Sequence, residues 1–145
     1  MPDLLKVVDI QAPLTTVHAL VASAEGIAAW WSPETSADGE GRVVVRFGAD
    51  WRVVLEKLEE TGSRVRWRVA EHDSDEWPGT ELVFDLSEAD GWTTLRFDHR
   101  GWAEATDFFR FCGTKWVAFL LSLKQAAETG RGAPYPDEIQ IGRNG

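Results

Sequence analysis

The stretch GTKWVAFLLSLKQAAET, residues 113–129, decides the fold. Its apolar side chains recur every three or four positions, a spacing typical of a helix with one buried face; they are Trp116, Phe119, Leu120, Leu123 and Ala127. Several upstream segments instead alternate apolar and polar residues with a period of two, which predicts strands with one apolar face. A sheet is therefore the expected partner of this helix.

Six strands are expected, at residues 4–12, 42–47, 51–56, 64–69, 80–88 and 92–100. Two short helices follow the first strand, one opened by Pro13 and one that ends before Ser32-Pro33. Residues 71–79 are acidic and turn-rich, so this segment, with its isolated Trp77, is predicted to be a mobile loop. Residues 103–111 are expected to form a short turn before the long helix, and residues 130–145 a surface tail.

The length and the net charge of the chain limit the classes of protein to which it could belong. With 145 residues the chain is expected to form one domain, residues 1–145. A net charge of −9 repels nucleic acid and anionic membranes, so neither is an expected partner. Cys112 is the sole cysteine, which fits a reducing compartment. The longest apolar run is far shorter than the roughly 20 residues of a membrane span, and a cytoplasmic protein is expected.

The sequence contains no motif that would carry catalysis. The three histidines have neither helical spacing nor neighbouring cysteines, so no metal site is predicted. The glycine pairs lack the context of a phosphate-binding loop, and no nucleophile elbow is present. No catalytic residue and no cofactor is predicted, and an enzymatic function is not favoured.

Three segments resemble a known family: AEGIAAWWSPE at 24–34, LRFDHRGW at 95–102 and TKWVAFLLSLKQAAETGRGAPYP at 114–136. They are similar to the START-like, birch-pollen-allergen-like (SRPBCC) superfamily, and within it to homologues of the activator of heat-shock protein 90 ATPase. The resemblance implies an α+β helix-grip fold, in which a curved antiparallel sheet of about six strands wraps the long C-terminal helix. Superfamily members bind lipids, polyketides, hormones or proteins, and some catalyse cyclisations, so the fold does not specify one function.

Nine side chains are predicted to contact a ligand between the sheet and the helix. They are Trp30, Trp31, Trp67, Phe84, Phe97, His99, Phe108, Trp116 and Leu120. Alternatives remain open for some: His99 either bonds a backbone carbonyl at the sheet edge or binds the ligand. Trp30 is expected in the core, and Trp31 either half-exposed or facing the cavity.

Three functional hypotheses follow. The first is non-enzymatic binding of a small hydrophobic or aromatic molecule in the cavity between the sheet and the helix. The second is a protein-interaction module that resembles the chaperone ATPase activator and uses the outer sheet or the Trp77 loop. The third, ranked below these, is a cyclase-like or hydrolase-like enzyme acting on an aromatic substrate, with His99 as acid or base.

Arginines alternate along one predicted strand, at Arg64, Arg66 and Arg68. They could bind a polyanion, or they could form ion pairs with carboxylates of neighbouring strands. The acidic residues Glu56, Glu81 and Asp85 belong to the same predicted face, and the net charge is negative. Cross-strand ion pairs are therefore the favoured interpretation.

Overall fold

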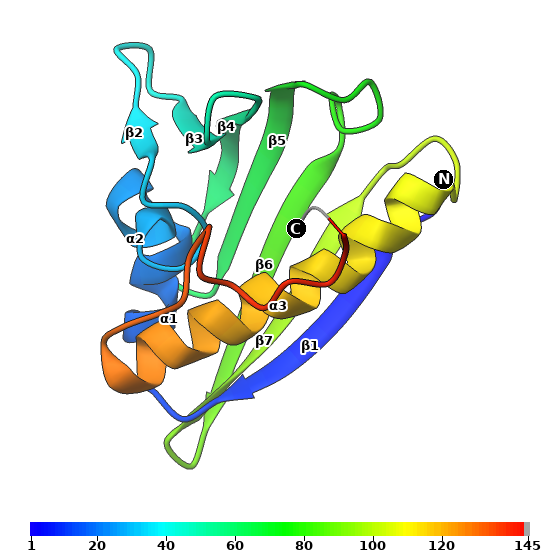
Figure 1. Ribbon diagram of the computed structural model, residues 1–145. Coiled ribbons are helices and arrows are strands. Elements are labelled where there is room, and N and C mark those ends of the chain that lie inside the picture. Colours follow the sequence, from blue (N-terminus) through cyan, green and yellow to red (C-terminus); the bar gives the residue numbers. More distant parts are fainter. Residues whose placement is uncertain (144–145) are drawn as a thin grey trace.

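The computed structural model of the protein describes residues 1–143 and is an α+β structure with one long helix laid across a curved sheet (Figure 1). In chain order the elements are β1 (Leu4–Ile10), α1 (Leu14–Val21), α2 (Ala24–Ala28), β2 (Thr35–Ala37), β3 (Val43–Phe47), β4 (Trp51–Glu60), β5 (Arg64–His72), β6 (Glu81–Ala89), β7 (Trp92–Arg100) and α3 (Asp107–Thr129). The strands form one antiparallel sheet in the order β1-β7-β6-β5-β4-β3-β2. The predicted helix-grip fold is confirmed.

The sheet has seven strands where six were expected. The additional strand, β2, is the three-residue segment Thr35–Ala37, which pairs with β3 at the sheet edge. Because β2 has only three residues and no large apolar side chain, it has no alternation that a sequence pattern could reveal. Both helices that follow β1 lie at the end of the sheet where α3 finishes (Figure 1).

Helix α3 begins six residues before the predicted start at Gly113. Thr106 caps it, because its side-chain oxygen accepts a hydrogen bond from Phe109 N at 3.1 Å. Gly113 therefore lies inside the helix and not at its start. A Cβ atom there would lie 2.9 Å from Leu4 Cδ2, so the glycine allows β1 to approach the helix closely.

The junction between α1 and α2 also depends on a glycine. Ser23 caps α2 by accepting a hydrogen bond from Gly26 N at 3.1 Å. A Cβ atom on Gly26 would lie only 2.0 Å from the Ala19 carbonyl oxygen, which belongs to α1. Only glycine fits this close crossing, and the crossing sets how the two short helices close the end of the sheet.

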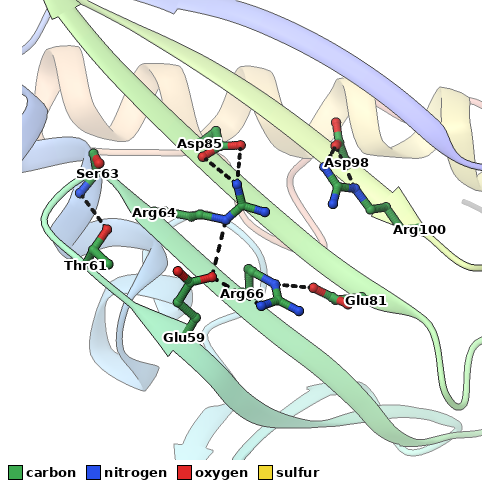
Figure 2. A network of polar contacts seen from close by, with 9 residues as sticks. All are labelled: Glu59, Thr61, Ser63, Arg64, Arg66, Glu81, Asp85, Asp98 and Arg100. Carbon is green, nitrogen blue, oxygen red and sulfur yellow. Dashed lines mark hydrogen bonds and ion pairs between the residues drawn. The ribbon is translucent and has the colours of Figure 1, made fainter.

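The outer face of the sheet carries an ordered network of arginines and carboxylates (Figure 2). Its pairs are Arg64 with Asp85 and Glu59, Arg66 with Glu59 and Glu81, and Arg68 with Glu56. Asp98 and Arg100, also in Figure 2, form a further pair at 2.6 Å. The favoured interpretation of cross-strand ion pairs is confirmed. Each arginine is balanced by an acid, so this face is not a cationic patch.

After α3 the chain turns at Gly130 and runs back along the helix toward its N-terminal end (Figure 1). Gly132 fits into a notch, where a Cβ would meet the carbonyl oxygens of Ala29 and Ser122 at 2.7 and 2.9 Å. Tyr135 N donates a hydrogen bond to Trp31 O at 2.9 Å. The predicted surface tail thus lies on the body of the protein; its residues 144 and 145 lie outside the described residues.

Candidate functional site

A cavity of about 710 Å³ lies between the sheet and the first half of α3. We call it the aromatic pocket. Its walls come from the segment after α2, from strands β3, β4 and β5, from the loop before β6, from α3 and from the tail. The lining residues are Trp31, Phe47, Trp51, Val53, His72, Trp77, Phe108, Phe111, Cys112, Lys115, Trp116, Phe119, Tyr135, Pro136, Glu138, Gln140 and Arg143. Most of these side chains are apolar, and many are aromatic. A flat apolar molecule would find contacts on several sides.

The space under the second half of α3 is filled by side chains. Trp30, Trp67 and Phe84 are almost completely buried there. Both indoles are held by backbone carbonyls at the end of α1: Trp30 Nε1 donates to Leu20 O at 2.7 Å, and Trp67 Nε1 donates to Val21 O at 3.0 Å. This region is a packed core, and none of these three residues lines the pocket.

Trp31 separates the packed core from the pocket. Its ring stacks on Trp30 with centroids 5.9 Å apart and planes 9° apart, and its other neighbours face the cavity. The Trp116 ring lies 4.9 Å away, and Trp77 lies 6.4 Å away in a stacked geometry. Both adjacent tryptophans are buried, but Trp30 belongs to the packed core and Trp31 lines the pocket.

His99 is fully buried behind the pocket and does not line it. Its Nδ1 accepts a hydrogen bond from Trp116 Nε1 at 3.1 Å, so the ring proton resides on Nε2, which lies 2.8 Å from Thr80 Oγ1. The Thr80 hydroxyl in turn donates to Trp77 O at 2.6 Å. Burial lowers the pKa of His99 to about 3, which keeps the ring neutral. Both nitrogens are used in holding two tryptophans of the pocket wall.

The loop before β6 is folded onto the sheet. Trp77 is only 7 % exposed, and its ring stacks on His72 with centroids 4.4 Å apart. The predicted loop between the strands is present, and stacking on His72 and Trp116 holds its Trp77 indole in the pocket wall. Burial lowers the pKa of His72 to about 4, so this imidazole carries no positive charge at neutral pH.

Cys112 lies in the wall contributed by α3. Burial raises the pKa of its thiol to about 11, against a smaller opposing effect of the Trp77 indole N–H. That contact does not have hydrogen-bond geometry, so Trp77 Nε1 is buried without a hydrogen-bond partner among residues 1–143. The thiol is therefore protonated and is a poor nucleophile.

One ion pair lies in the mainly apolar wall, between Lys115 on α3 and Glu138 on the tail. Lys115 Nζ and Glu138 Oε2 are 2.6 Å apart, and the two side chains are 18 % and 2 % exposed. The second carboxylate oxygen, Glu138 Oε1, is buried and has no hydrogen-bond partner in the described part of the chain. The pair fastens the tail to α3 at the edge of the cavity.

The nine predicted ligand contacts divide into two groups. Trp31, Phe108 and Trp116 line the aromatic pocket. The other six lie in the packed core or behind the pocket wall: Trp30, Trp67, Phe84, Phe97, His99 and Leu120. Phe97 still touches the wall from behind, since its ring centroid is 4.5 Å from that of Trp116.

Sequence reasoning missed much of the pocket wall. Phe47 and Trp51 flank the turn between β3 and β4. The alternation of apolar and polar residues shows which face of a strand is apolar, but it does not show which residues lie opposite that face across the cavity. Tyr135 and Glu138 belong to the tail, which has no periodic pattern. The one available signal was the presence of single aromatic residues, Trp77 and Tyr135, in otherwise polar segments.

Two classes of site are not found in the described residues. No group of three or more His, Cys, Asp or Glu side chains within residues 1–143 could hold a metal ion. Over the same residues, no helix combines the length and the hydropathy that crossing a membrane requires.

Comparison with known proteins places the chain in a family. The sheet, the gripped helix and the cavity between them define a START-like helix-grip protein. In the solved Aha1 dimer from Colwellia psychrerythraea the same fold superposes with a TM-score of 0.80 and 31 % identity, over 91 % of this chain and 100 % of that chain. The chain belongs to the Aha1-like family of START-like (SRPBCC) proteins. No protein-family model and no curated protein matches it.

More distant structures share the fold alone. DynU16, a protein of the dynemicin biosynthetic locus, has a TM-score of 0.73 and 21 % identity, over 92 % of this chain and 49 % of its own. A Bacillus halodurans protein has a TM-score of 0.68 and 21 % identity, over 88 % of this chain and 98 % of its own. Because one fold hosts many functions, these likenesses support the fold and no particular function.

Proposed function

We propose that the chain binds a small hydrophobic or aromatic molecule in the aromatic pocket, without catalysing a reaction. The observation that carries this proposal is the contrast between a cavity of about 710 Å³ and the filled core beside it. Pockets for small organic ligands are commonly about 300–1,000 Å³ and are lined by apolar and aromatic groups. The aromatic pocket falls in this range.

The rim of the pocket supports the same proposal. Trp51 and Phe111, which both line it, are 45 % and 43 % exposed. Large apolar groups left in water at a cavity mouth gain stability when a ligand covers them. Trp51 and Phe108 already stack with centroids 6.4 Å apart, so together they present an aromatic entrance.

Native mass spectrometry of the protein purified from its own cells tests this proposal. The mass under native conditions is expected to exceed the mass after denaturation by that of one bound small molecule. A variant with the pocket obstructed, Cys112→Trp, should lose the excess mass while remaining folded by circular dichroism. If the native mass equals the chain mass, and added apolar probes also fail to bind, the proposal is wrong.

A second candidate function is an interaction module that acts on a chaperone, as the family likeness suggests. The observation that favours it is the 31 % identity to the Colwellia psychrerythraea Aha1 protein over nearly the whole chain. The relevant test is whether the purified chain binds heat-shock protein 90 and raises its ATPase rate. The Trp77 loop is a poor contact surface for such a partner because Trp77 is buried.

The enzyme hypothesis has less support from the geometry. His99 lies outside the pocket lining, and hydrogen bonds occupy both of its nitrogens. A general acid or base must reach the reacting atom of the substrate directly or through one water. His72 does line the pocket, but Ser74 N donates to its Nδ1 at 2.9 Å and Trp77 covers one ring face.

A further inference from the structure

Glu138 contributes a buried carboxylate to a wall that is otherwise mainly apolar. Its residue exposure is 5 %, and it lies in the tail segment that faces the first half of α3. One oxygen, Oε2, is 2.6 Å from Lys115 Nζ. The other oxygen, Oε1, has no hydrogen-bond partner within residues 1–143 and is inaccessible to water.

An ionised oxygen without a partner is an unusual feature of a protein interior. Buried polar atoms are nearly always hydrogen-bonded, and carboxylates form the strongest of these bonds. Lys115 already neutralises the charge through Oε2, so Oε1 needs a hydrogen-bond donor and not a second positive charge. Because Glu138 lines the pocket, a molecule bound there can supply that donor once the carboxylate turns toward the cavity.

The contact requires little movement of the protein. The terminal torsion of a glutamate side chain is broad, so a small rotation can turn Oε1 toward the cavity while Oε2 stays with the lysine. The lysine stem is flexible and can follow such a rotation. The rest of the wall, including Trp31, Trp116 and Phe119, offers ring faces to the body of the ligand.

We infer that Glu138 selects aromatic molecules that carry a hydroxyl group, by accepting a hydrogen bond from that hydroxyl through Oε1. This inference rests on the proposed function, because it specifies the chemistry of the molecule in the aromatic pocket. A neutral hydroxyl is the matching donor, since the Lys115–Glu138 pair already has no net charge. An aromatic molecule of the same shape that can only accept hydrogen bonds leaves Oε1 unpaired and binds more weakly.

Calorimetric titration of the whole chain with 2-naphthol and with 2-methoxynaphthalene tests the inference. The two probes share a fused ring, but only 2-naphthol has a hydrogen to donate. The native chain is expected to bind 2-naphthol about tenfold more tightly or better, the preference expected for a hydrogen bond to a charged group. Equal affinities would overturn the inference and leave the proposed function standing. If neither probe binds, both the proposed function and this inference are wrong.

The substitution Glu138→Gln sharpens the test by reversing the chemistry at one atom. Lys115 requires an oxygen facing it, so the amide nitrogen of the glutamine takes the position of Oε1 and presents donors to the pocket. The variant is expected to lose the preference for 2-naphthol and to favour 2-methoxynaphthalene. Glu40→Gln is the matched control, because the Glu40 side chain is 78 % exposed and does not line the pocket. A preference for 2-naphthol that persists in Glu138→Gln would assign the selection to another group and overturn the inference.

Discussion

The two halves of the space under α3 are lined by the same residue types, but one half is filled by side chains and the other contains a cavity. Under the second half, Trp30 and Trp67 donate their indole hydrogens to carbonyls at the end of α1, and the region is filled. Under the first half, Trp77 Nε1 has no hydrogen-bond partner among residues 1–143, and a cavity of about 710 Å³ remains. The presence of α1 and α2 at only one end of the sheet accounts for this difference (Figure 1).

The same aromatic residue types thus build a filled core at one end of the sheet and the wall of a cavity at the other. At the filled end both indoles, Trp30 and Trp67, have a backbone carbonyl as a polar partner as well as close packing. At the open end Trp77 has no such partner and stacks on Trp31 and Trp116, of which Trp116 donates to His99. Ring stacking adds only about 0.5–1.5 kcal/mol beyond area burial. A ligand can therefore replace part of this contact at low energetic cost.

The largest expected effect comes from removing an indole at the filled end. Trp67→Ala should lower the free energy of unfolding by about 3–5 kcal/mol, because it leaves a cavity that the surrounding core cannot collapse to fill. Urea denaturation measures this change. Trp67→Phe keeps most of the volume but leaves Val21 O without its donor, and should cost about 1–3 kcal/mol. Equal, small losses for both variants would contradict a packed core.

Acid sensitivity should depend on the histidine behind the pocket wall. The pKa of His99 is about 3 in the folded chain, below its ordinary value of 6.5, so the unfolded chain binds the proton more readily. The contribution of neutral His99 to the free energy of unfolding is therefore fully present above pH 6.5. It is lost as the pH drops from 6.5 toward 3, by about 1.4 kcal/mol per pH unit. His99→Gln should remove this slope, a difference of about 2 kcal/mol between pH 6.5 and 5.

Free energies of unfolding measured between pH 7 and 5 test this dependence. In that range the carboxylates whose pKa the fold lowers, such as Asp38 and Glu128, remain largely ionised in both states. His72 has a pKa of about 4 and adds a slope of the same sign, which the His99→Gln variant keeps. Identical slopes in the native chain and the variant would show that His99 is accessible to protons in the folded state.

Loss of the Lys115–Glu138 ion pair should increase amide hydrogen exchange in the tail more than in the core. Lys115→Met removes the cation beside the buried Glu138 carboxylate. Breaking a buried pair costs about 3–5 kcal/mol where neither group can move, but residues 136–143 can carry Glu138 back into water, so about 1 kcal/mol is expected. Faster amide hydrogen exchange in residues 136–143 measures the release.

A second lysine of the same helix provides the control for that experiment. Lys124 pairs with Glu128 at 2.7 Å, and both side chains are more than a quarter exposed. Lys124→Met should change stability by less than about 1 kcal/mol and leave the exchange of the tail unchanged. If Lys115→Met also leaves the tail protected, its position depends on the notch at Gly132 and not on the ion pair.

The sequence was sufficient for the fold because the fold depends on repeated patterns. The apolar stripe of α3 and the alternation along β5 extend over many residues, so one irregular position does not obscure them. The charges of Arg64, Arg66 and Arg68 could be assigned to ion pairs because opposite charges recur on the neighbouring strands. Short or irregular features, such as β2 and the early start of α3, had no repeat to reveal them.

The site could be predicted only in part, because it depends on contacts between distant segments. No spacing in the sequence shows that Trp77 stacks on His72, or that Glu138 reaches Lys115 across the cavity. Inward-facing positions such as Trp67 and Phe84 were predicted correctly as inward, yet the sequence does not show which end of the sheet α1 and α2 cover. The sequence therefore shows which side chains face the helix, but not whether they lie at the filled end or at the open end of the sheet.

The smallest expected change in stability comes from the rim of the pocket. Trp51 is 45 % exposed, so Trp51→Ala should alter the free energy of unfolding by about 0.5 kcal/mol. The same substitution removes one side of the aromatic entrance and should weaken binding of 2-naphthol by about fivefold or more. Trp92→Ala is the control, because Trp92 is 40 % exposed but does not line the pocket.

Side-chain NMR of the indole N–H groups tests the contrast between the two ends most directly. The chain has eight tryptophans, so each indole gives a separate reporter when 2-naphthol is added to the labelled protein. The signals of Trp31, Trp51, Trp77 and Trp116 are expected to shift, while those of Trp30 and Trp67 stay in place. Shifts of Trp30 and Trp67 with the pocket signals unchanged would contradict the assignment of the open end as the ligand site.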